Sequence, residues 1–204
     1  MIYEIRTYDL HPRMVPEYQK RFAEKLPGRL KFSPLGGHWY TDVGTINQIV
    51  AIWPYDSLEH RTETRTRVEE AGVWPPDTGE YIVSMVSEIF LPAPFMTRLA
   101  ERDIGPIYEM RIYTYPPEDI PMLLDAWGSR MEERERLSPL AGCWYKESGG
   151  HGNFVHMWAY SSFDERLRIR DEAREKGIWP PASPARLVKQ RTKILLPASF
   201  SPMQ

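Results

Sequence analysis

The heptapeptide "IYEIRTY" at residues 2–8 returns almost unchanged as "IYEMRIY" at residues 107–113. The offset between these two stretches aligns the chain with itself without a gap, placing residues 2–95 on residues 107–200. Roughly a third of the aligned pairs are identical, and a gapless internal match of this length indicates duplication. The two halves are therefore expected to share one backbone.

Further matched stretches keep the same register. They are "SPLGGHWY" with "SPLAGCWY", "VAIWPYDS" with "VHMWAYSS", "GVWPP" with "GIWPP" and "FLPAPF" with "LLPASF". The duplication divides the chain into a first repeat at 1–95, a linker at 96–106 and a second repeat at 107–200.

Four short or alternating apolar segments in the first repeat are typical of strands, at residues 2–8, 37–43, 48–55 and 82–90. Between the first two lies a stripe of apolar residues at spacings of three and four, which predicts an amphipathic helix. The stripe stays apolar in the second repeat although every identity changes: Val15, Tyr18, Phe22 and Leu26 become Ile120, Leu123, Trp127 and Met131.

A second helix is predicted after the third strand. Ser57 and Ser162 are placed as its N-caps, with Ser162 and Glu165 fitting a capping box. Gly72 and Gly177 suit its C-terminal end. Each repeat therefore has the order β-α-β-β-α-β, which is ferredoxin-like.

A ferredoxin-like unit covers only one face of its sheet with helices. The other face must meet water or another sheet, and two fused copies can cover each other. The expected fold class is α+β, with tandem repeats pairing sheet to sheet as a dimeric α+β barrel within one chain.

The first strand of each repeat has two distinct faces. We expect the apolar set Tyr3, Ile5 and Thr7 to lie under the helices. The set Glu4, Arg6 and Tyr8, repeated as Glu109, Arg111 and Tyr113, would then face the space between the two sheets. Charges buried there must be paired, so this set is either a structural ion-pair ladder or the polar lining of a ligand cavity.

The third strand of the second repeat places Phe154, His156, Trp158 and Tyr160 on one face. His156 has no counterpart, because the first repeat has Ala51 at that position. This histidine is either a satisfied core residue or a functional group such as a general base or an axial metal ligand.

Two further sets recur in register. Arg61 and Arg65 return as Arg166 and Arg170, and their spacing puts each pair on one helical face, as partners for carboxylates or as an anion clamp. Three tryptophans also recur, as packing anchors or as the walls of an aromatic pocket: Trp39, Trp53 and Trp74, with Trp144, Trp158 and Trp179.

Composition excludes several classes of partner. The formal net charge is −2, without a block of like charges, so neither a nucleic-acid footprint nor a basic membrane patch is expected. Cys143 is the only cysteine, which excludes an intramolecular disulfide and fits a reducing compartment. Without a signal-peptide pattern or a long apolar run, we expect a cytoplasmic protein.

Common catalytic motifs are missing as well. The sequence lacks GxGxxG after a strand, GxxxxGK[ST], HExxH, CxxC and GxSxG. Its five histidines, at positions 11, 38, 60, 151 and 156, are too dispersed to indicate zinc. We therefore expect no metal and no cofactor.

The stretches "YEIRTY", "GGHWY" and "INQIVAIWPY" resemble the NIPSNAP domain, and "YEMRIY", "AGCWY" and "NFVHMWAY" resemble a further copy. The resemblance covers nearly the whole chain and implies a dimeric α+β barrel. In the family pattern an asparagine is followed by histidine, tryptophan and tyrosine. The first repeat has Asn47 but Ala51 in place of the histidine, whereas the second has His156 but Gly152 in place of the asparagine.

Relatives in the wider superfamily include cofactor-free oxygenases, isomerases and haem enzymes, which is an analogy of fold only. We expect a small molecule to bind in the barrel, with the site biased to the second repeat. His156 would transfer a proton and Arg111 would hold an anionic group. The expected ligand-binding residues are Glu109, Tyr113, Trp158, Tyr160, Glu4, Arg6 and Trp53.

Two alternatives remain. One is a non-catalytic interaction module whose barrel is filled by side chains, and the other is haem binding at His156. Exposed edge strands and many aromatic residues also favour a homo-oligomer.

Overall fold

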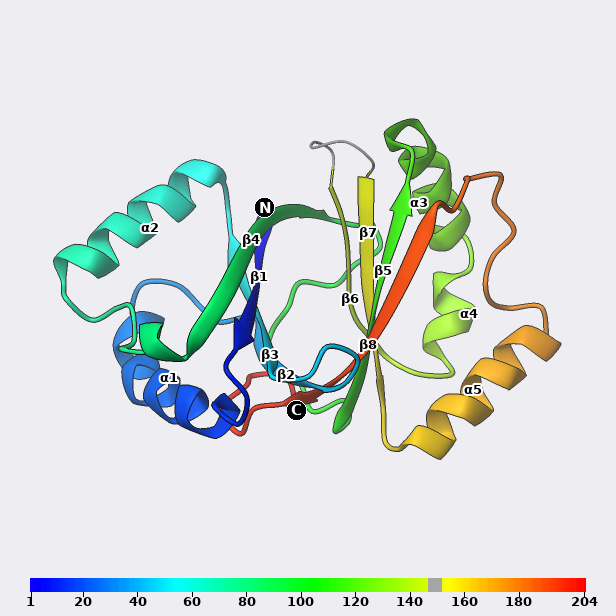
Figure 1. Ribbon diagram of the computed structural model, residues 1–204. Helices are drawn as coiled ribbons and strands as arrows, with labels where there is room; N and C mark the ends of the chain where they lie inside the picture. Colours follow the sequence, from blue (N-terminus) through cyan, green and yellow to red (C-terminus); the bar gives the residue numbers. More distant parts are fainter. Residues whose placement is uncertain (147–151) are drawn as a thin grey trace. The chain divides into compact units, whose positions relative to one another are not determined.

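The computed structural model of the chain describes residues 1–146 and 152–204 (Figure 1). The first repeat forms, in order, β1 (Ile2–Leu10), α1 (Val15–Leu30), β2 (Gly37–Val43), β3 (Gln48–Tyr55), α2 (Leu58–Glu70), the 3-10 turn η1 (Gly79–Tyr81) and β4 (Ile82–Pro92). The second forms β5 (Ile107–Tyr115), the 3-10 turn η2 (Pro117–Asp119), α3 (Ile120–Gly128), α4 (Met131–Glu135), β6 (Leu140–Tyr145), β7 (Gly152–Tyr160), α5 (Phe163–Glu175) and β8 (Lys189–Pro197).

Both repeats form antiparallel sheets with the ferredoxin-like strand order. In the first the order is β4-β1-β3-β2, and in the second it is β8-β5-β7-β6. Hydrogen bonds join the eight strands in one closed order, β1-β3-β2-β8-β5-β7-β6-β4. The predicted fold class, an α+β barrel of two tandem repeats in one chain, is confirmed.

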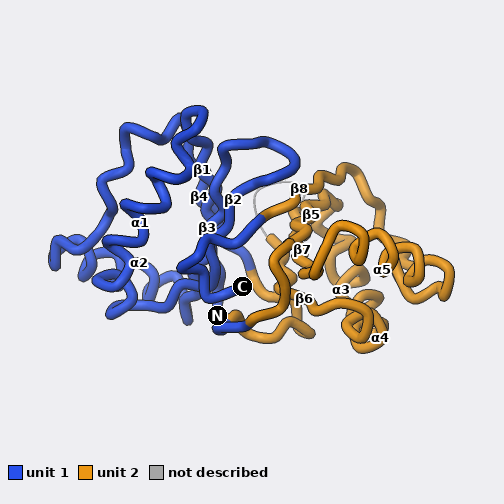
Figure 2. Tube along the Cα trace, turned by 90° about the horizontal axis from the view of Figure 1, so that it is seen from below, with its two compact units in different colours: residues 1–90, 100–102, 196–204 blue, residues 91–99, 103–195 orange. Residues whose placement is uncertain are grey.

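The chain forms two compact units whose limits differ from those of the repeats (Figure 2). Unit 1 contains residues 1–90, 100–102 and 196–204, and unit 2 contains residues 91–99 and 103–195. The end of each repeat thus belongs to the other repeat's unit. In unit 2 the Ala93 N–H donates to the Cys143 carbonyl at 2.9 Å, and in unit 1 the Ala198 N–H donates to the His38 carbonyl at 3.0 Å.

The predicted apolar stripes are the buried faces of the first helices. Tyr18, Phe22 and Leu26 are buried on α1. Their counterparts on α3 and α4 are buried as well, although this helix is interrupted after Gly128. The hydroxyls of Ser57 and Ser162 accept from the N–H groups of His60 and Glu165, which confirms both N-caps.

The predicted orientation of the first strand is wrong. Glu4 points to the helix side of its sheet, because its carboxylate accepts a hydrogen bond from Arg61 of α2 at 2.5 Å. Glu109 likewise accepts from Arg166 of α5 at 2.6 Å. Both faces of this strand are buried, as Tyr3 and Glu4 are each 0% exposed. The alternation of residue types along the strand therefore does not indicate which face the helices cover. The hydrogen bonds from Arg61 and Arg166, which lie on helices, identify that face as the one that carries Glu4 and Glu109.

Candidate functional site

A cavity of about 330 Å³ lies in unit 2, on the helix-covered face of its sheet. The sequence analysis predicted a site in the barrel interior instead. That prediction was wrong because it turned the face of Glu109, Arg111 and Tyr113 away from the helices. Six residues predicted for the second-repeat site line this cavity together: Glu109, Arg111, Tyr113, His156, Trp158 and Tyr160.

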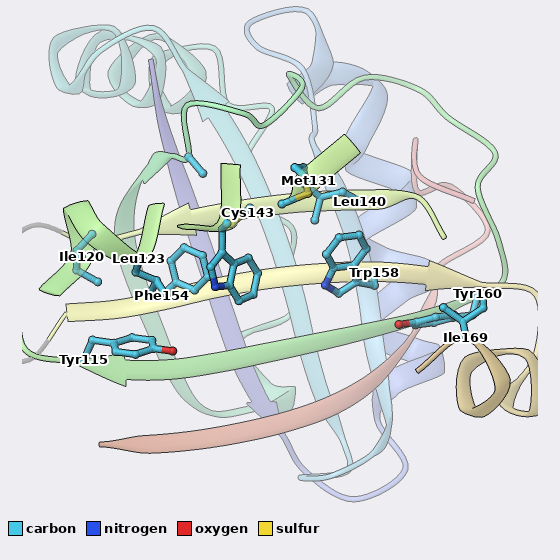
Figure 3. Packing of buried hydrophobic residues seen from close by; sticks show 12 residues of the cluster. Tyr115, Ile120, Leu123, Met131, Leu140, Cys143, Phe154, Trp158, Tyr160 and Ile169 are labelled. Carbon is cyan, nitrogen blue, oxygen red and sulfur yellow. The ribbon is translucent and has the colours of Figure 1, made fainter. Parts of the chain in front are cut away.

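The register of two neighbouring strands brings these side chains together. Arg111 of β5 lies opposite His156 of β7, and Glu109 lies opposite Trp158. Alternation then turns every second residue of each strand toward the helices. Figure 3 shows Phe154 and Trp158 following each other along β7, with Leu123 of α3 beside Phe154.

Glu109 is enclosed by arginines and is not free to act on a ligand. Arg166 binds one of its oxygens at 2.6 Å, and Arg170 lies 3.1 Å from both oxygens. Arg111 is farther away, at 3.9 Å. The carboxylate thus pairs most closely with the arginines of α5. Arg111 is its most distant ion-pair partner and lies beside the Tyr113 ring, whose centre is 5.2 Å from the guanidinium.

The cavity also contains Arg134 of α4, which sequence reasoning missed. Its side chain is buried and donates to the Ser138 hydroxyl at 2.8 Å and the Tyr160 hydroxyl at 3.2 Å. Its guanidinium lies 4.0 Å from the centre of the Trp158 ring. Burial lowers the pKa of Arg134, and the neighbouring Tyr160 hydroxyl opposes that shift.

Both hydroxyls that accept from Arg134 are neutral, and no carboxylate lies within ion-pairing distance of it among residues 1–146 and 152–204. A buried cation without a counter-ion is costly, so this position favours an anion. The sequence did contain an indication that this residue is important, because both repeats have an arginine at this position, Arg29 in the first and Arg134 in the second.

His156 is 1% exposed and lies against aromatic rings. Its Nδ1 accepts a hydrogen bond from the Trp158 indole N–H at 2.9 Å. Burial lowers the pKa of His156 well below its usual value, and Arg111, Arg134 and Arg170 lower it further. The imidazole is therefore neutral, and because Nδ1 accepts, the proton lies on Nε2.

The Nε2–H group of His156 has no hydrogen-bond partner in the part of the chain that the structure describes. In this state it is a donor, which suits an oxygen atom of a ligand. A general base or an axial haem ligand would need the lone pair at Nε2 instead. The geometry thus favours hydrogen-bond donation over the two functional roles considered from the sequence.

The predicted site residues of the first repeat belong to unit 1. Arg6 and Trp53 line a cavity of about 260 Å³ there. Glu4 is enclosed by Arg6 at 3.0 Å and Arg61 at 2.5 Å. Burial alone would raise the pKa of Glu4, but the Arg61 hydrogen bond, the Arg6 charge and the Ser87 hydroxyl together lower it to about 2.

The described residues contain neither a membrane-spanning helix nor a cluster of metal-binding side chains. None of the helices is long and apolar enough to cross a membrane. Residues 1–146 and 152–204 contain no group of three or more His, Cys, Asp or Glu side chains arranged to hold a metal ion. His151, one of the five histidines considered above, lies outside the described residues.

Comparison with known proteins follows the duplication. The NIPSNAP family profile matches residues 3–97 and again residues 108–202. A NipSnap homolog of Dictyostelium discoideum is 27% identical over 205 residues, covering 98% of this chain and 88% of the relative. Human NipSnap homolog 3A is 27% identical over 215 residues, covering 100% of this chain and 86% of the relative.

A solved structure also aligns with the whole chain. A Lactobacillus acidophilus protein, provisionally described as a monooxygenase, aligns with a TM-score of 0.63 over 96% of this chain and 92% of its own. Its sequence is only 9% identical, so the likeness concerns the fold alone. The two profile matches span nearly the whole sequence, and the chain therefore belongs to the NIPSNAP family, with two tandem copies of the domain.

Proposed function

We propose that the second repeat binds a small anionic molecule with a flat apolar part. The observation that carries this proposal is Arg134, a buried cation without a carboxylate partner among the described residues, at the wall of an aromatic cavity. An anion at this point supplies the missing counter-charge.

The cavity supports such a ligand in size and lining. Its volume of about 330 Å³ is within the range of small-molecule sites. Trp127 and Trp179 meet edge to face at 4.4 Å, and Trp158 lies 5.6 Å from Trp179. Aromatic walls bury a flat ring well, while arginines bind its charged end.

His156 and Arg111 supply further contacts. The Nε2–H of His156 donates to a ligand oxygen, and Arg111, opposite it on β5, neutralises negative charge. If the ligand is transformed, these groups act by stabilising charge that develops on an oxygen, as an oxyanion hole does. Fixed donors in a water-poor cavity stabilise an enolate-like state more than its neutral precursor.

Native mass spectrometry of the gently purified protein tests binding. We expect an excess mass that is lost on denaturation. His156→Ala, which gives the second repeat the residue found at Ala51, should weaken binding of the released ligand roughly tenfold, because one buried hydrogen bond is lost. His11→Ala, at an exposed position, is the control.

Absence of bound mass, together with no binding of benzoate or phthalate at millimolar concentration, would contradict the proposal. That result would favour the alternative, a non-catalytic interaction module. The same spectrum counts the chains in the particle.

We also propose a homo-oligomer, supported by a group of exposed apolar residues on β4. Val83, Met85 and Val86 of this strand are 60%, 50% and 52% exposed. Exposed apolar side chains that gather on one strand favour contact with another copy of the chain. A monomeric mass at micromolar concentration would contradict this part of the proposal.

A further inference from the structure

We infer that the first repeat carries a second and independent binding site, for a small flat monocarboxylate. The site is the cavity of about 260 Å³ in unit 1. Nine residues line it, and all belong to that unit: Arg6, Arg29, Trp53, Tyr55, Arg65, Val68, Glu69, Trp74 and Pro75.

A buried guanidinium again supplies the anion-binding charge. Arg29 is 4% exposed, and it donates to the Ser33 hydroxyl at 2.8 Å and the Tyr55 hydroxyl at 3.0 Å. Its guanidinium lies 4.4 Å from the centre of the Trp53 ring. Among residues 1–146 and 152–204 no carboxylate lies within ion-pairing distance of Arg29.

Burial of a charge without a counter-ion is expensive, and the neutral hydroxyls satisfy only hydrogen bonds. A ligand carboxylate beside Arg29 removes that cost. The planar guanidinium donates two parallel hydrogen bonds to the two oxygens of a carboxylate, and a spherical halide ion does not match this geometry. Arg29 therefore favours a carboxylate.

Aromatic walls determine the shape of the rest of the ligand. Trp53 and Trp74 meet edge to face at 5.9 Å, and Phe22 packs against Trp74 at 4.9 Å. Val68 adds an aliphatic surface. The apolar part of the ligand is thus a small ring with its carboxylate directed toward Arg29.

Two substitutions between the repeats separate the specificities of the two sites. Ala51 occupies the position of His156, so the first site lacks the neutral imidazole donor that the second site offers. Glu69 occupies the position of Arg174, and both residues line their cavities. The carboxylate of Glu69 repels a second negative charge, so the first site prefers a monoanion. Arg174, which pairs with Asp171 at 3.0 Å, adds no such repulsion to the second site.

Titration with benzoate, a monoanion, and phthalate, a dianion, tests the inference by NMR of assigned tryptophan indole N–H signals. Trp53 and Trp74 report the first site, while Trp158 and Trp179 report the second. We expect benzoate to shift both pairs. Phthalate should bind the first site several-fold more weakly than the second relative to benzoate.

Matched variants separate the sites. Arg65→Met, a change at a side chain that is 50% exposed, should weaken benzoate binding at the first site only. Arg170→Met should weaken it at the second site only. Glu69→Arg should raise the affinity of the first site for phthalate about fivefold, an effect on the scale of a partly exposed charge.

The inference fails if the Trp53 and Trp74 signals stay fixed at saturating benzoate. It fails equally if Arg170→Met abolishes their shifts, because they would then report the second site. A failure of the second site alone leaves the first-site signals responsive, so the two proposals are tested separately.

Discussion

Trp158 donates its indole N–H to Nδ1 of His156 at 2.9 Å, and the face of the same indole ring lies 4.0 Å from the guanidinium of Arg134. One tryptophan thus contacts two of the polar groups of the second-repeat cavity, His156 and Arg134. Its N–H fixes the tautomer of the histidine, and its ring face stabilises the buried cation. In the first repeat, Trp53 supports Arg29 in the same way, but Ala51 leaves the indole without a histidine beside it.

The first prediction concerns the protonation of His156. Its pKa is lowered well below 6.5 by burial and by three arginines, so the ring should stay neutral, with the proton on Nε2, across the range around pH 6.5 in which histidine ordinarily titrates. Nitrogen-15 NMR of labelled histidine distinguishes the two tautomers and the charged form.

Trp158→Phe removes the donor to Nδ1 and should produce a mixture of tautomers. His11 is exposed and serves as an internal reference in the same spectra. Titration of His156 near pH 6.5 would contradict the prediction and would restore the role of a general base.

A second prediction concerns stability and rests on His38, whose two ring nitrogens have no hydrogen-bond partner in the described part of the chain. The ring packs against Phe22 at 4.5 Å and Phe200 at 4.9 Å. Burial lowers the pKa of His38 to about 3. In the unfolded chain the His38 imidazole therefore binds a proton near pH 6.5, whereas in the folded chain it stays neutral at that pH. The free energy of unfolding consequently falls as pH drops below 6.5.

At pH 5 this difference amounts to about 2 kcal/mol of unfolding free energy. His38→Cys, which introduces the residue of the second repeat, Cys143, should remove this part of the pH dependence. Urea unfolding at pH 8 and pH 5 measures it, with His11→Ala as the control. The prediction would be contradicted if the unfolding free energy of His38→Cys fell between pH 8 and pH 5 by as much as that of the wild type.

A third prediction concerns the carboxylate at the centre of the first arginine cluster. Glu4 has a pKa of about 2 in the folded protein, well below the ordinary glutamate value of 4.5. A lowered carboxyl pKa stabilises the fold above pH 4.5, and this stabilisation is lost as pH falls toward 2. Glu4→Gln should therefore cost about 3 kcal/mol at neutral pH.

The difference between Glu4→Gln and wild type should shrink steadily below pH 4.5. Chemical unfolding at pH 7 and pH 3 tests this dependence. Glu63→Gln, at an exposed position of the same unit and outside the arginine cluster, is a suitable control. A difference that persists unchanged at pH 3 would mean that packing, rather than charge, explains the loss.

The duplication made the fold predictable, because the patterns typical of strands, helices and helix caps occur at matched positions in both repeats. The orientation of the first strand was not predictable from alternation, since Tyr3 on one face and Glu4 on the other are equally buried. The decisive evidence was the position of Arg61 on a helix, and only a three-dimensional contact assigns that arginine to Glu4.

The site was predicted in part. His156 and Trp158 were placed on one face of a strand, and their hydrogen bond confirms that placement. Arg134 was missed because an arginine near the end of a helix is usually solvated. Its burial depends on contacts with Ser138, on the chain leading to the next strand, and with Tyr160, on a different strand.

The last prediction concerns the irregular segment 178–188, which forms one wall of the second-repeat cavity through residues such as Trp179, Pro181 and Leu187. Its middle is held by Arg186. The backbone N–H and Nε of that residue donate to Asp119 Oδ2 at 2.8 and 2.9 Å, and Nη2 donates to Oδ1 at 3.0 Å. In the first repeat Tyr81 and Met14 occupy these positions, so this contact is specific to the second.

Arg186→Ala should therefore raise amide hydrogen exchange across residues 178–188 roughly tenfold, because charge-assisted hydrogen bonds that hold the segment are lost. Arg191→Ala removes an equal charge from an exposed position on β8 and should leave exchange unchanged. The Arg186 hydrogen bonds lower the pKa of Asp119, so the contact persists at neutral pH and weakens only in strong acid. If both variants exchange like wild type, the ends of the segment alone hold it, through the Trp179 and Val188 backbone bonds to Ala173 and Thr114.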